Sequence, residues 1–365
     1  MVGRRRLKRR EVARSSAVFK PQATCEANPL FVGLPPFAED MSPQGYMGRS
    51  FSWRHPDLDL PPSINDWNDD HRLIALARRG EDCTGDLLLG EESLDRFLAG
   101  RPEATSPEHY PTLAAASAQS QPGSSAGGEQ PKFAAFSEGR HVLVKFTAGD
   151  RSDLSQRWRD LLWCEQAALG SLRQAGFKAA RARCLDVAEQ RFLEVERFDR
   201  VGARGRQPVL SLGAIDDEYF GHRDSWSKAA RRMAEAGHLS PEEGRRLRWL
   251  DVFGGLIGNT DRHFGNITLF AYAPHHYRLA PVYDMLPMFL APASGQLVER
   301  AFNPPPPTSE TLEVWHEAAH WAVSYWEQIA QSPEVSDLFR NIASSCAESV
   351  KRLGETVPAL RRPSN

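Results

Sequence analysis

The fold of this chain is best read from one stretch, Leu256-Ile257-Gly258-Asn259-Thr260-Asp261-Arg262-His263-Phe264-Gly265-Asn266, and from the string that follows it, Pro281-Val282-Tyr283-Asp284. Phosphoryl transfer needs a carboxylate near the acceptor hydroxyl, an amide oxygen on Mg²⁺, and a second carboxylate that joins the metal to the nucleotide phosphates. Asp261 and Asn266, five positions apart, followed by Asp284, meet that requirement. The same spacing also arises by chance where a helix ends in an Asn-Thr-Asp turn.

A lysine and a glutamate upstream favour the phosphotransferase interpretation. Lys145 lies late in an alternating strand, between Val144 and Phe146, where a lysine is uncommon unless its ammonium has a buried or bound partner. Glu165 falls in the next predicted helix and can form the strand-lysine to helix-glutamate ion pair of kinases. An edge-strand position for Lys145 and a solvated position for Glu165 remain the simpler alternatives.

Two further segments have the composition of nucleotide-contacting loops. Residues 123–132 form a Gly/Ser-rich loop that leads into a strand, and its backbone N–H groups suit phosphate oxygens. Residues 195–200, Val-Glu-Arg-Phe-Asp-Arg, end a strand where a kinase hinge would present the backbones of Glu196 and Phe198 to adenine. Each segment alone is weak evidence, because many flexible loops and charged strand ends have such a composition.

Hydrophobic periodicity predicts a strand-rich first half and a helix-rich second half. In the first half we expect four strands, at 132–137, 141–147, 182–187 and 192–198. A helix at 153–175 is expected to connect the second strand to the third. Later elements are expected as a helix from Pro241 to about residue 257, a hairpin formed by 267–272 and 277–283, and amphipathic helices at 310–330 and 335–355 that offer Trp315, Trp321, Trp326 and Leu338 for packing. This order predicts an α+β fold of two lobes with a mainly helical C-lobe.

Composition divides the chain into five expected parts. These are a basic leader at 1–40, a small N-terminal subdomain at 41–104, a linker with the Gly/Ser-rich loop at 105–130, a kinase N-lobe at 131–200, and a helical C-lobe at 201–365. The linker assignment rests on a stretch rich in Pro, Ala, Ser, Gln and Gly with few large apolar residues to bury.

The overall composition is that of an ordinary globular protein. The chain has 365 residues, of which 41% are hydrophobic and 25% charged, which excludes a disordered or fibrous protein. Its net charge of −2 hides an asymmetry, since residues 1–14 hold seven bases and one acid, which leaves 38 bases and 46 acids elsewhere. No apolar run is long enough for a membrane helix or a signal peptide, and the five cysteines form no Cys-x-x-Cys pair. A cytoplasmic protein without a membrane partner is expected.

In combination, the motifs resemble the HipA family of serine/threonine kinase toxins. The matching strings are Ser-x-x-Gly-x-Gln-x-Lys (Ser125, Gly128, Gln130, Lys132), Val144-Lys145, Val-Glu-Arg-Phe-Asp-Arg (195–200), Thr-Asp-x-His-x-x-Asn (260–266) and Pro-x-Tyr-Asp (281–284). Gly33-Leu34-Pro35-Pro36 and residues 43–49 are similar to the YjjJ-like branch, whose members ordinarily begin with a winged-helix DNA-binding domain. Here that domain is expected to be absent or reduced to a last basic segment.

The resemblance implies ATP and Mg²⁺ as cofactors and a role for each matched residue. Asp261 would be the catalytic base, accompanied by His263, and Asn266 and Asp284 would hold Mg²⁺. ATP would be bound by Lys145, the backbones of Glu196 and Phe198, and the loop residues Gly127, Gly128, Gln130 and Lys132. Ser125, with Ser124 as a neighbouring competitor, would be autophosphorylated, which places a dianion in the phosphate loop and turns the kinase off. Pro131 stands where the prototype has an acid, which alters the backbone donors of this loop.

Three functions remain open from the sequence. The first is a protein kinase toxin with an unidentified protein substrate and an antitoxin partner. The second is a small-molecule kinase of the aminoglycoside or choline type, which shares the Asp-x-His-x-x-Asn pattern. The third is a DNA-binding regulator that keeps the kinase fold as a scaffold and contacts DNA through its basic N-terminus. Retention of Lys145, Asp261, Asn266 and Asp284 favours an active enzyme.

Overall fold

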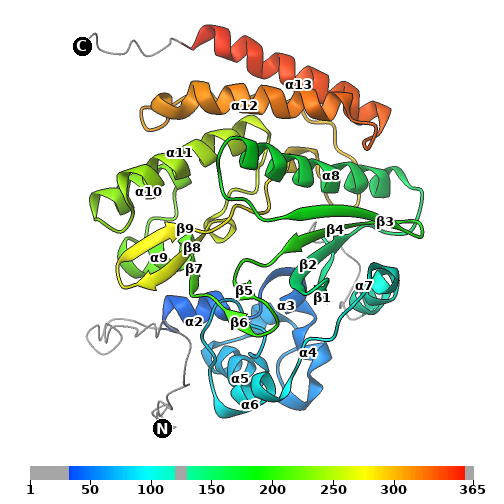
Figure 1. Cartoon of the computed structure of the whole chain (residues 1–365), viewed down its shortest axis with the longest axis vertical. Helices are drawn as coiled ribbons and strands as arrows, with labels where there is room; N and C mark the ends of the chain where they lie inside the picture. The colour runs from blue at the N-terminus through cyan, green and yellow to red at the C-terminus, as the bar shows by residue number, and fades with distance from the viewer. Residues whose placement is uncertain (1–32, 120–129, 358–365) are drawn as a thin grey trace.

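The computed structural model describes residues 33–119 and 130–357, which form three stacked parts. Figure 1 shows a group of short helices at one end, a four-stranded sheet in the middle, and long helices at the other end. The predicted α+β, two-lobed fold class is confirmed.

The first part consists of short helices, here called the N-terminal subdomain. They are α2 (Pro36–Met41), α3 (Gly45–Arg49), α4 (Phe51–Arg54), α5 (Asp69–Arg79) and α6 (Glu91–Ala99). Helix α5 begins with a capping box, in which the Asn68 side chain accepts from the His71 N–H and the His71 ring accepts from the Asn68 N–H. Phe51 and Trp67 pack edge to face at 5.6 Å in a small core of its own.

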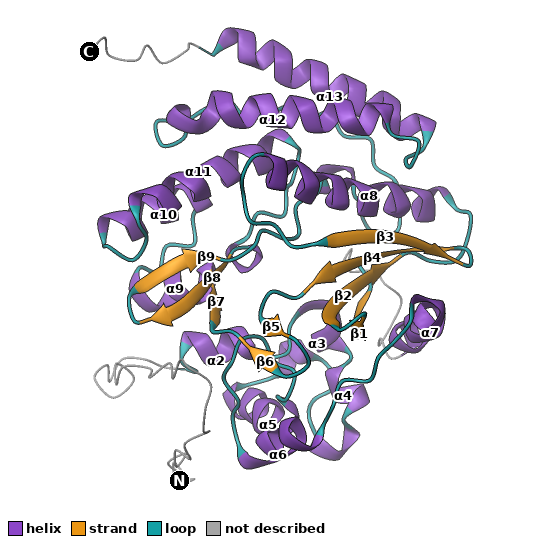
Figure 2. Ribbon diagram, in the orientation of Figure 1, coloured by secondary structure: helices purple, strands orange, loops and turns teal. Residues whose placement is uncertain are grey.

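The segment that follows corrects one expectation from the sequence. Part of the predicted linker, Tyr110–Gln119, forms helix α7 beside the sheet (Figure 2). Tyr110 is fully buried against Phe133 and Phe192, and its hydroxyl donates to Glu194 at 2.5 Å. One aromatic side chain therefore anchors a stretch whose remaining residues are small, which composition alone does not reveal.

The N-lobe is an antiparallel sheet with the strand order β1-β2-β4-β3. Its strands are β1 (Lys132–Ser137), β2 (Arg140–Phe146), β3 (Ala182–Val187) and β4 (Gln190–Glu196), and helix α8 (Asp153–Gln174) packs on β3 and β4. These elements lie within two residues of the predicted ranges. Alternating side chains such as Val142 and Val144 face the core, which explains why the period-2 pattern was informative.

The C-lobe combines five helices and a small sheet among the described residues. The helices are α9 (Leu212–Tyr219), α10 (Trp226–Glu235), α11 (Pro241–Leu256), α12 (Leu312–Gln331) and α13 (Asp337–Thr356). The sheet has the order β7-β8-β9, with strands β7 (Val209–Ser211), β8 (Thr268–Ala273) and β9 (His276–Leu279). Between the two lobes lies the hairpin of β5 (Arg200–Val201) and β6 (Gly205–Arg206).

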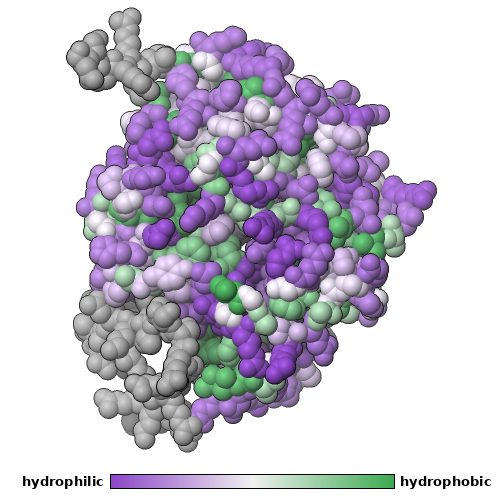
Figure 3. Space-filling model, in the orientation of Figure 1, coloured by the Kyte–Doolittle hydropathy of each residue, from purple (hydrophilic) through white to green (hydrophobic). Residues whose placement is uncertain are grey.

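Four tryptophans fill the core of the C-lobe. Trp226, Trp249, Trp315 and Trp326 are each at most 1% exposed. Leu338, which the sequence offered as a packing residue, is 62% exposed, because its neighbour Phe339 takes the inward position on the first turn of α13. Figure 3 shows mostly hydrophilic residues over α12 and α13, as expected for amphipathic helices that cover a core.

Candidate active site

The site is centred on a buried ion-pair cluster formed by Lys145, Glu165 and Asp284. Lys145 on β2 is 4% exposed, and its Nζ donates to the Oε1 and Oε2 of Glu165 on α8 at 2.8 and 2.6 Å. The same Nζ also forms an ion pair with Asp284, which lies after β9 in the C-lobe. One ammonium thus joins two lobes, and the lysine–glutamate pair expected from the sequence is present.

Burial and neighbouring charges have opposite effects on the pKa values of the three residues in this cluster. Burial favours the neutral ammonium, but Asp284 and Glu165 outweigh it and raise the pKa of Lys145. Burial also favours a neutral Asp284, yet the charges of Lys145 and Lys132 lower the pKa of its carboxyl. Burial raises the pKa of Glu165, which has no exposed surface. Lys145 is therefore charged and Asp284 ionised at neutral pH.

Asp284 is held in an unusual backbone conformation. Its φ is +53°, in the left-handed region that aspartate tolerates better than most residues. The fully buried side chain of Asn259 donates to its carbonyl at 3.3 Å. Because the Asp284 side chain is 28% exposed, its carboxylate remains accessible from the space between the lobes.

Asn259 also fixes the loop that carries Asp261. Its Oδ1 accepts from the Asp261 N–H at 2.9 Å, so that one amide contacts both the Asp261 and the Asp284 segments. Arg262 reinforces this arrangement by donating to the Asn259 carbonyl and, at 3.1 Å, to Asp251. The sequence analysis quoted Asn259 without giving it a role, and its burial in the structure shows that it positions the loop.

Asn266 faces Asp261 across a short 3₁₀ turn, Phe264–Asn266. Its Nδ2 donates to the Asp261 carbonyl at 2.8 Å and approaches Oδ2 of the same residue at 3.4 Å. This use of Nδ2 leaves Oδ1 as the amide atom suited to a cation. Tyr283 stabilises the turn, because its hydroxyl donates to the Gly265 carbonyl at 2.7 Å.

His263 lies beside Asp261 with a defined ring orientation. Its Nδ1 accepts from the Gly265 N–H at 3.0 Å, so Nε2 carries the proton in the neutral ring. That Nε2 is 3.8 Å from Oδ1 of Asp261. The Asp261 side chain is 52% exposed, which leaves its carboxylate open to an incoming group.

The structure describes only the last three residues of the Gly/Ser-rich loop, 130–132. The predicted loop residues Ser124, Ser125, Gly127 and Gly128 lie outside the described residues. Among those that follow, Gln130 donates its Nε2 to the carbonyl of Phe146, the residue after Lys145. Lys132 pairs with Lys145 in the β1–β2 register, and its charge acts on both Glu165 and Asp284. The end of the loop therefore lies next to the ion-pair cluster.

Glu196 and Phe198 lie at the end of β4, between the lobes. The Glu196 N–H donates to the Arg181 carbonyl at 2.8 Å, and the Phe198 carbonyl accepts from the Gln207 side chain at 2.8 Å. The Phe198 ring packs 5.6 Å from the ring of Tyr283.

Comparison with known proteins shows which family this chain belongs to. A family model described as "HipA-like C-terminal domain" matches residues 124–353, and one described as "YjjJ-like toxin, middle domain" matches residues 7–98. A curated relative, Toxin YjjJ of Escherichia coli (strain K12), is 36% identical over 343 residues, covering 90% of this chain and 77% of the relative. The chain belongs to the YjjJ-like branch of the HipA toxin family.

One solved structure with a TM-score above 0.5 shares the fold of this chain. The HipA chain of the Shewanella oneidensis MR-1 toxin–antitoxin complex of HipA, HipB and operator DNA has a TM-score of 0.54 at 15% identity, covering 88% of this chain and 84% of its own. The Helicobacter pylori proinflammatory kinase CtkA has a TM-score of 0.43 at 14% identity, covering 63% of this chain and 90% of its own. No helix in the described parts of this HipA-family chain is long and apolar enough to cross a membrane.

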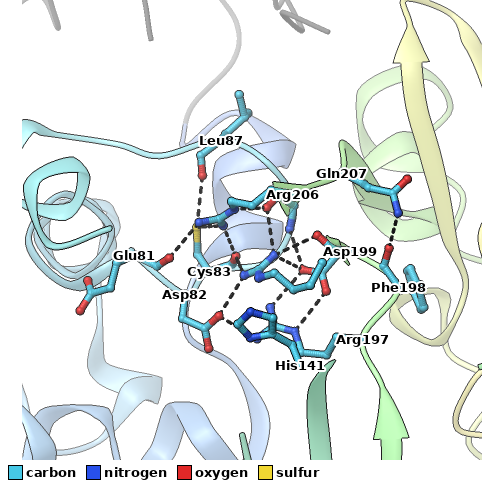
Figure 4. A network of polar contacts seen from close by, with 12 residues as sticks. Glu81, Asp82, Cys83, Leu87, His141, Arg197, Phe198, Asp199, Arg206 and Gln207 are labelled. Atoms are coloured by element: carbon cyan, nitrogen blue, oxygen red, sulfur yellow. Dashed lines mark hydrogen bonds and ion pairs between the residues drawn. The ribbon is translucent and has the colours of Figure 1, made fainter. Parts of the chain in front are cut away.

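The charged residues of the Val-Glu-Arg-Phe-Asp-Arg string have a role that the sequence did not reveal. In this HipA-family member they fasten the N-terminal subdomain to the hinge, as Figure 4 shows. Arg197 and Arg200 both donate to Asp82, at 2.8 and 3.0 Å. Arg197 and Arg200 also pair with Asp199, which is 5% exposed.

Backbone groups of residues 81–85 complete this network, here called the hinge joint. Asp199 accepts from the Gly85 N–H at 3.2 Å, and Arg206 donates to the carbonyls of Glu81 and Gly85 at 2.8 and 2.6 Å. Arg200 adds a 2.7 Å bond to the Cys83 carbonyl. The partners lie more than a hundred positions apart in the chain, so no local sequence pattern could have paired them.

Proposed function

We propose that this protein is an ATP- and Mg²⁺-dependent serine/threonine protein kinase that acts as a toxin on a cellular protein. The observation that carries the proposal is the cluster of Lys145, Glu165 and Asp284, which lies beside a loop where Asn259 holds Asp261. A buried lysine shared between a helix glutamate and an aspartate of the opposite lobe fits nucleotide phosphate binding.

The donor set fits a magnesium nucleotide. Mg²⁺ prefers hard oxygen ligands, and the ionised carboxylate of Asp284 and the Oδ1 of Asn266 are of this kind. Lys145 and Lys132 would neutralise the phosphates, with Gln130, Gly127 and Gly128 completing the phosphate loop. Bound Mg²⁺ would supply charge stabilisation at the transferred phosphoryl group.

Asp261 is the proposed catalytic base. Its half-exposed carboxylate can accept the proton of a serine or threonine hydroxyl, and its backbone is fixed by Asn259 and Asn266. The neutral ring of His263 would donate from Nε2 toward Asp261 and steady the carboxylate. Backbone groups of Glu196 and Phe198 would bind adenine.

Regulation and partners follow from the family and remain part of the proposal. Ser125, or its neighbour Ser124, would be autophosphorylated, and the resulting dianion would turn the kinase off because it repels the phosphates of ATP. An antitoxin partner and DNA contact are both proposed from the complex of HipA, HipB and operator DNA. The seven bases within residues 1–14 would supply the DNA contact.

Purified protein incubated with γ-labelled ATP and Mg²⁺ tests the proposal. Labelling of the protein itself should fall by about 10²–10⁴-fold in Asp261→Ala, because a general base contributes that much. It should fall sharply in Ser125→Ala, while Asp95→Ala, an exposed acid on α6, should match the wild type. A wild type that neither binds ATP nor labels any protein would show that the kinase assignment is wrong.

A further inference from the structure

A polar cleft of about 470 Å³ lies beside the loop of residues 259–266 that carries Asp261, here called the catalytic loop, between the N-terminal subdomain and the C-lobe. Its walls come from α2, α3 and α5 on one side, and from α9 and the catalytic loop on the other. The side chains and backbone groups that matter here are those of Glu39, Asp40, Arg72, Arg223, His263 and Gly265. In Figure 2 the helices α2 and α9 lie near one another, below and beside the β7-β8-β9 sheet.

The floor of the cleft is continuous with the catalytic loop. His263 and Gly265 line the cleft, and Nε2 of His263 is 3.8 Å from Oδ1 of Asp261. A side chain at position 265 would not fit, because a Cβ there would lie 2.9 Å from the His263 ring. A chain segment bound in the cleft would therefore pass directly beside the candidate base.

The walls are held together without a ligand. The carboxylate of Asp40 on α2 accepts from the Ser211 N–H at 2.9 Å, where α9 begins. This bond ties the N-terminal subdomain to the C-lobe at the edge of the cleft. A cleft that is already formed saves the cost of ordering on binding.

Two charged side chains on the cleft wall, Glu39 and Arg72, have neither an ion pair nor a side-chain hydrogen bond among the residues that the structure describes. Asp217 and Arg223 neutralise each other, with the Arg223 Nε donating to Asp217 at 2.7 Å. Neither Glu39 on α2 nor Arg72 on α5 forms an ion pair with any other residue that the structure describes. Apart from Asp40, whose carboxylate accepts from the Ser211 N–H, the cleft therefore presents one acid and one base without an ion-pair partner among the described residues, on two different helices.

We propose that this cleft binds the polypeptide segment carrying the acceptor hydroxyl, and that Glu39 and Arg72 select a segment with one basic and one acidic residue near the serine or threonine. The proposal rests on the kinase function above and adds a substrate class to it. Small-molecule pockets are lined mostly by apolar side chains, whereas this lining is largely polar and suits the amides of an extended chain. Nucleic acid would require an excess of bases, but the acids Glu39, Asp40 and Asp217 outnumber the bases here.

The test uses a panel of synthetic serine-centred peptides assayed with the full-length protein and Mg²⁺-ATP. Each peptide carries one lysine and one aspartate, placed in both orders and at varied distances from the serine. The wild type should prefer one order by about tenfold in kcat/KM. The double variant Glu39→Lys with Arg72→Glu should prefer the opposite order, because both wall charges are exchanged.

Matched controls keep the two proposals separate. Glu355→Lys, an exposed helix acid on α13, should leave the peptide preference unchanged. Calorimetric titration with Mg²⁺-ATP checks that the charge-swapped protein still binds nucleotide.

If the wild type phosphorylates peptides and the charge-swapped protein keeps the same preference, the cleft proposal is wrong while the kinase function stands. If the wild type binds ATP but labels proteins and no peptide, the cleft proposal is also wrong. A wild type that neither binds ATP nor labels protein overturns the kinase function, and the cleft proposal with it.

Discussion

The ion-pair cluster and the hinge joint are two sets of charges near the N-lobe sheet, and the side chains of Lys145, Arg197 and Arg200 are at most 16% exposed. Both combine basic side chains with carboxylates from distant parts of the chain. The cluster has one ammonium, Lys145, between Glu165 and Asp284. The joint has Arg197, Arg200 and Arg206 between two carboxylates and several backbone carbonyls.

The difference lies in the kind of partner that each base has. Arg200 in the joint donates to Asp82, Asp199 and the carbonyls of Cys83 and Gly85, so little of its hydrogen-bonding capacity remains. In the cluster, Lys145 contacts only the carboxylates of Glu165 and Asp284, and the Asp284 side chain is 28% exposed. The comparison teaches that arginines bound to backbone carbonyls as well as to carboxylates fix one part of the chain to another, whereas an ammonium bound only to carboxylate side chains fixes no backbone.

The largest effect is expected from Lys145→Met. It leaves Glu165 buried without a partner, which should lower the free energy of unfolding by about 3–5 kcal/mol, and it should abolish ATP-dependent labelling. Adding Glu165→Leu should restore most of the stability, because an apolar pair can replace a buried ion pair, but no labelling. Urea unfolding and γ-ATP labelling of both variants measure this. Labelling by the double variant would contradict a role of Lys145 in ATP binding.

The joint should respond in the opposite way to Asp199→Asn. Loss of this charge leaves Arg197 and Arg200 under-compensated, and stability should fall by about 3 kcal/mol while labelling by the folded protein stays within a few-fold. Glu138→Gln removes an exposed carboxylate that also pairs with arginine, and should have a much smaller effect on unfolding. A larger loss of unfolding free energy in Glu138→Gln than in Asp199→Asn would contradict a structural role for the hinge joint.

The Asp199→Asn variant also tests how the stability of the protein depends on pH. Burial opposes ionisation of Asp199, but Arg197 and Arg200 prevail and lower its pKa to about 2. A carboxyl with a lowered pKa stabilises the fold above its ordinary pKa, and that contribution is lost as the pH falls toward 2. The stability difference between wild type and Asp199→Asn should therefore shrink by about 2 kcal/mol between pH 5 and pH 2. A constant difference would show that the charge is not responsible.

The smallest effect is expected from Tyr283→Phe, which tests how the cluster is connected to the catalytic loop. The substitution removes the hydroxyl that donates to Gly265, at a cost of about 1 kcal/mol in unfolding free energy. Labelling should fall several-fold, because the turn that carries Asn266 loses its support. Tyr272→Phe removes a hydroxyl that donates to the Gln207 side chain from a tyrosine that is 48% exposed, and should change both quantities less than Tyr283→Phe does. Equal effects in both variants would contradict a positioning role for Tyr283.

Much of the architecture could be predicted from the sequence, because it is encoded in local patterns. Period-2 alternation located β1 and β2, and Ser240-Pro241 located the start of α11, where the Ser240 side chain accepts from the Glu243 N–H. The motif spacing brought Lys145, Asp261 and Asp284 into one hypothesis. Their roles in catalysis remain predictions.

The features that escaped prediction depend on contacts between distant residues. Helix α7 is held by Tyr110, whose partner Glu194 lies on β4. The hinge joint needs residues 81–85 to meet residues 197–206, and the cleft needs α2 to meet α9. Such pairings arise only when the lobes are assembled, so one sequence without its fold could not indicate them.

The attachment of the N-terminal subdomain on two sides has a mechanical consequence. It is fixed to the strand end between the lobes through Asp82 and Arg197, and to the C-lobe through Asp40 and Ser211. Because the N-terminal subdomain contacts both the end of the N-lobe sheet and the C-lobe, it limits rotation of the two lobes. Rotation of one lobe against the other would have to break these contacts, so they favour one angle between the lobes. Under the proposed kinase function, selection among substrates would then depend on the shape of an opening that exists before binding.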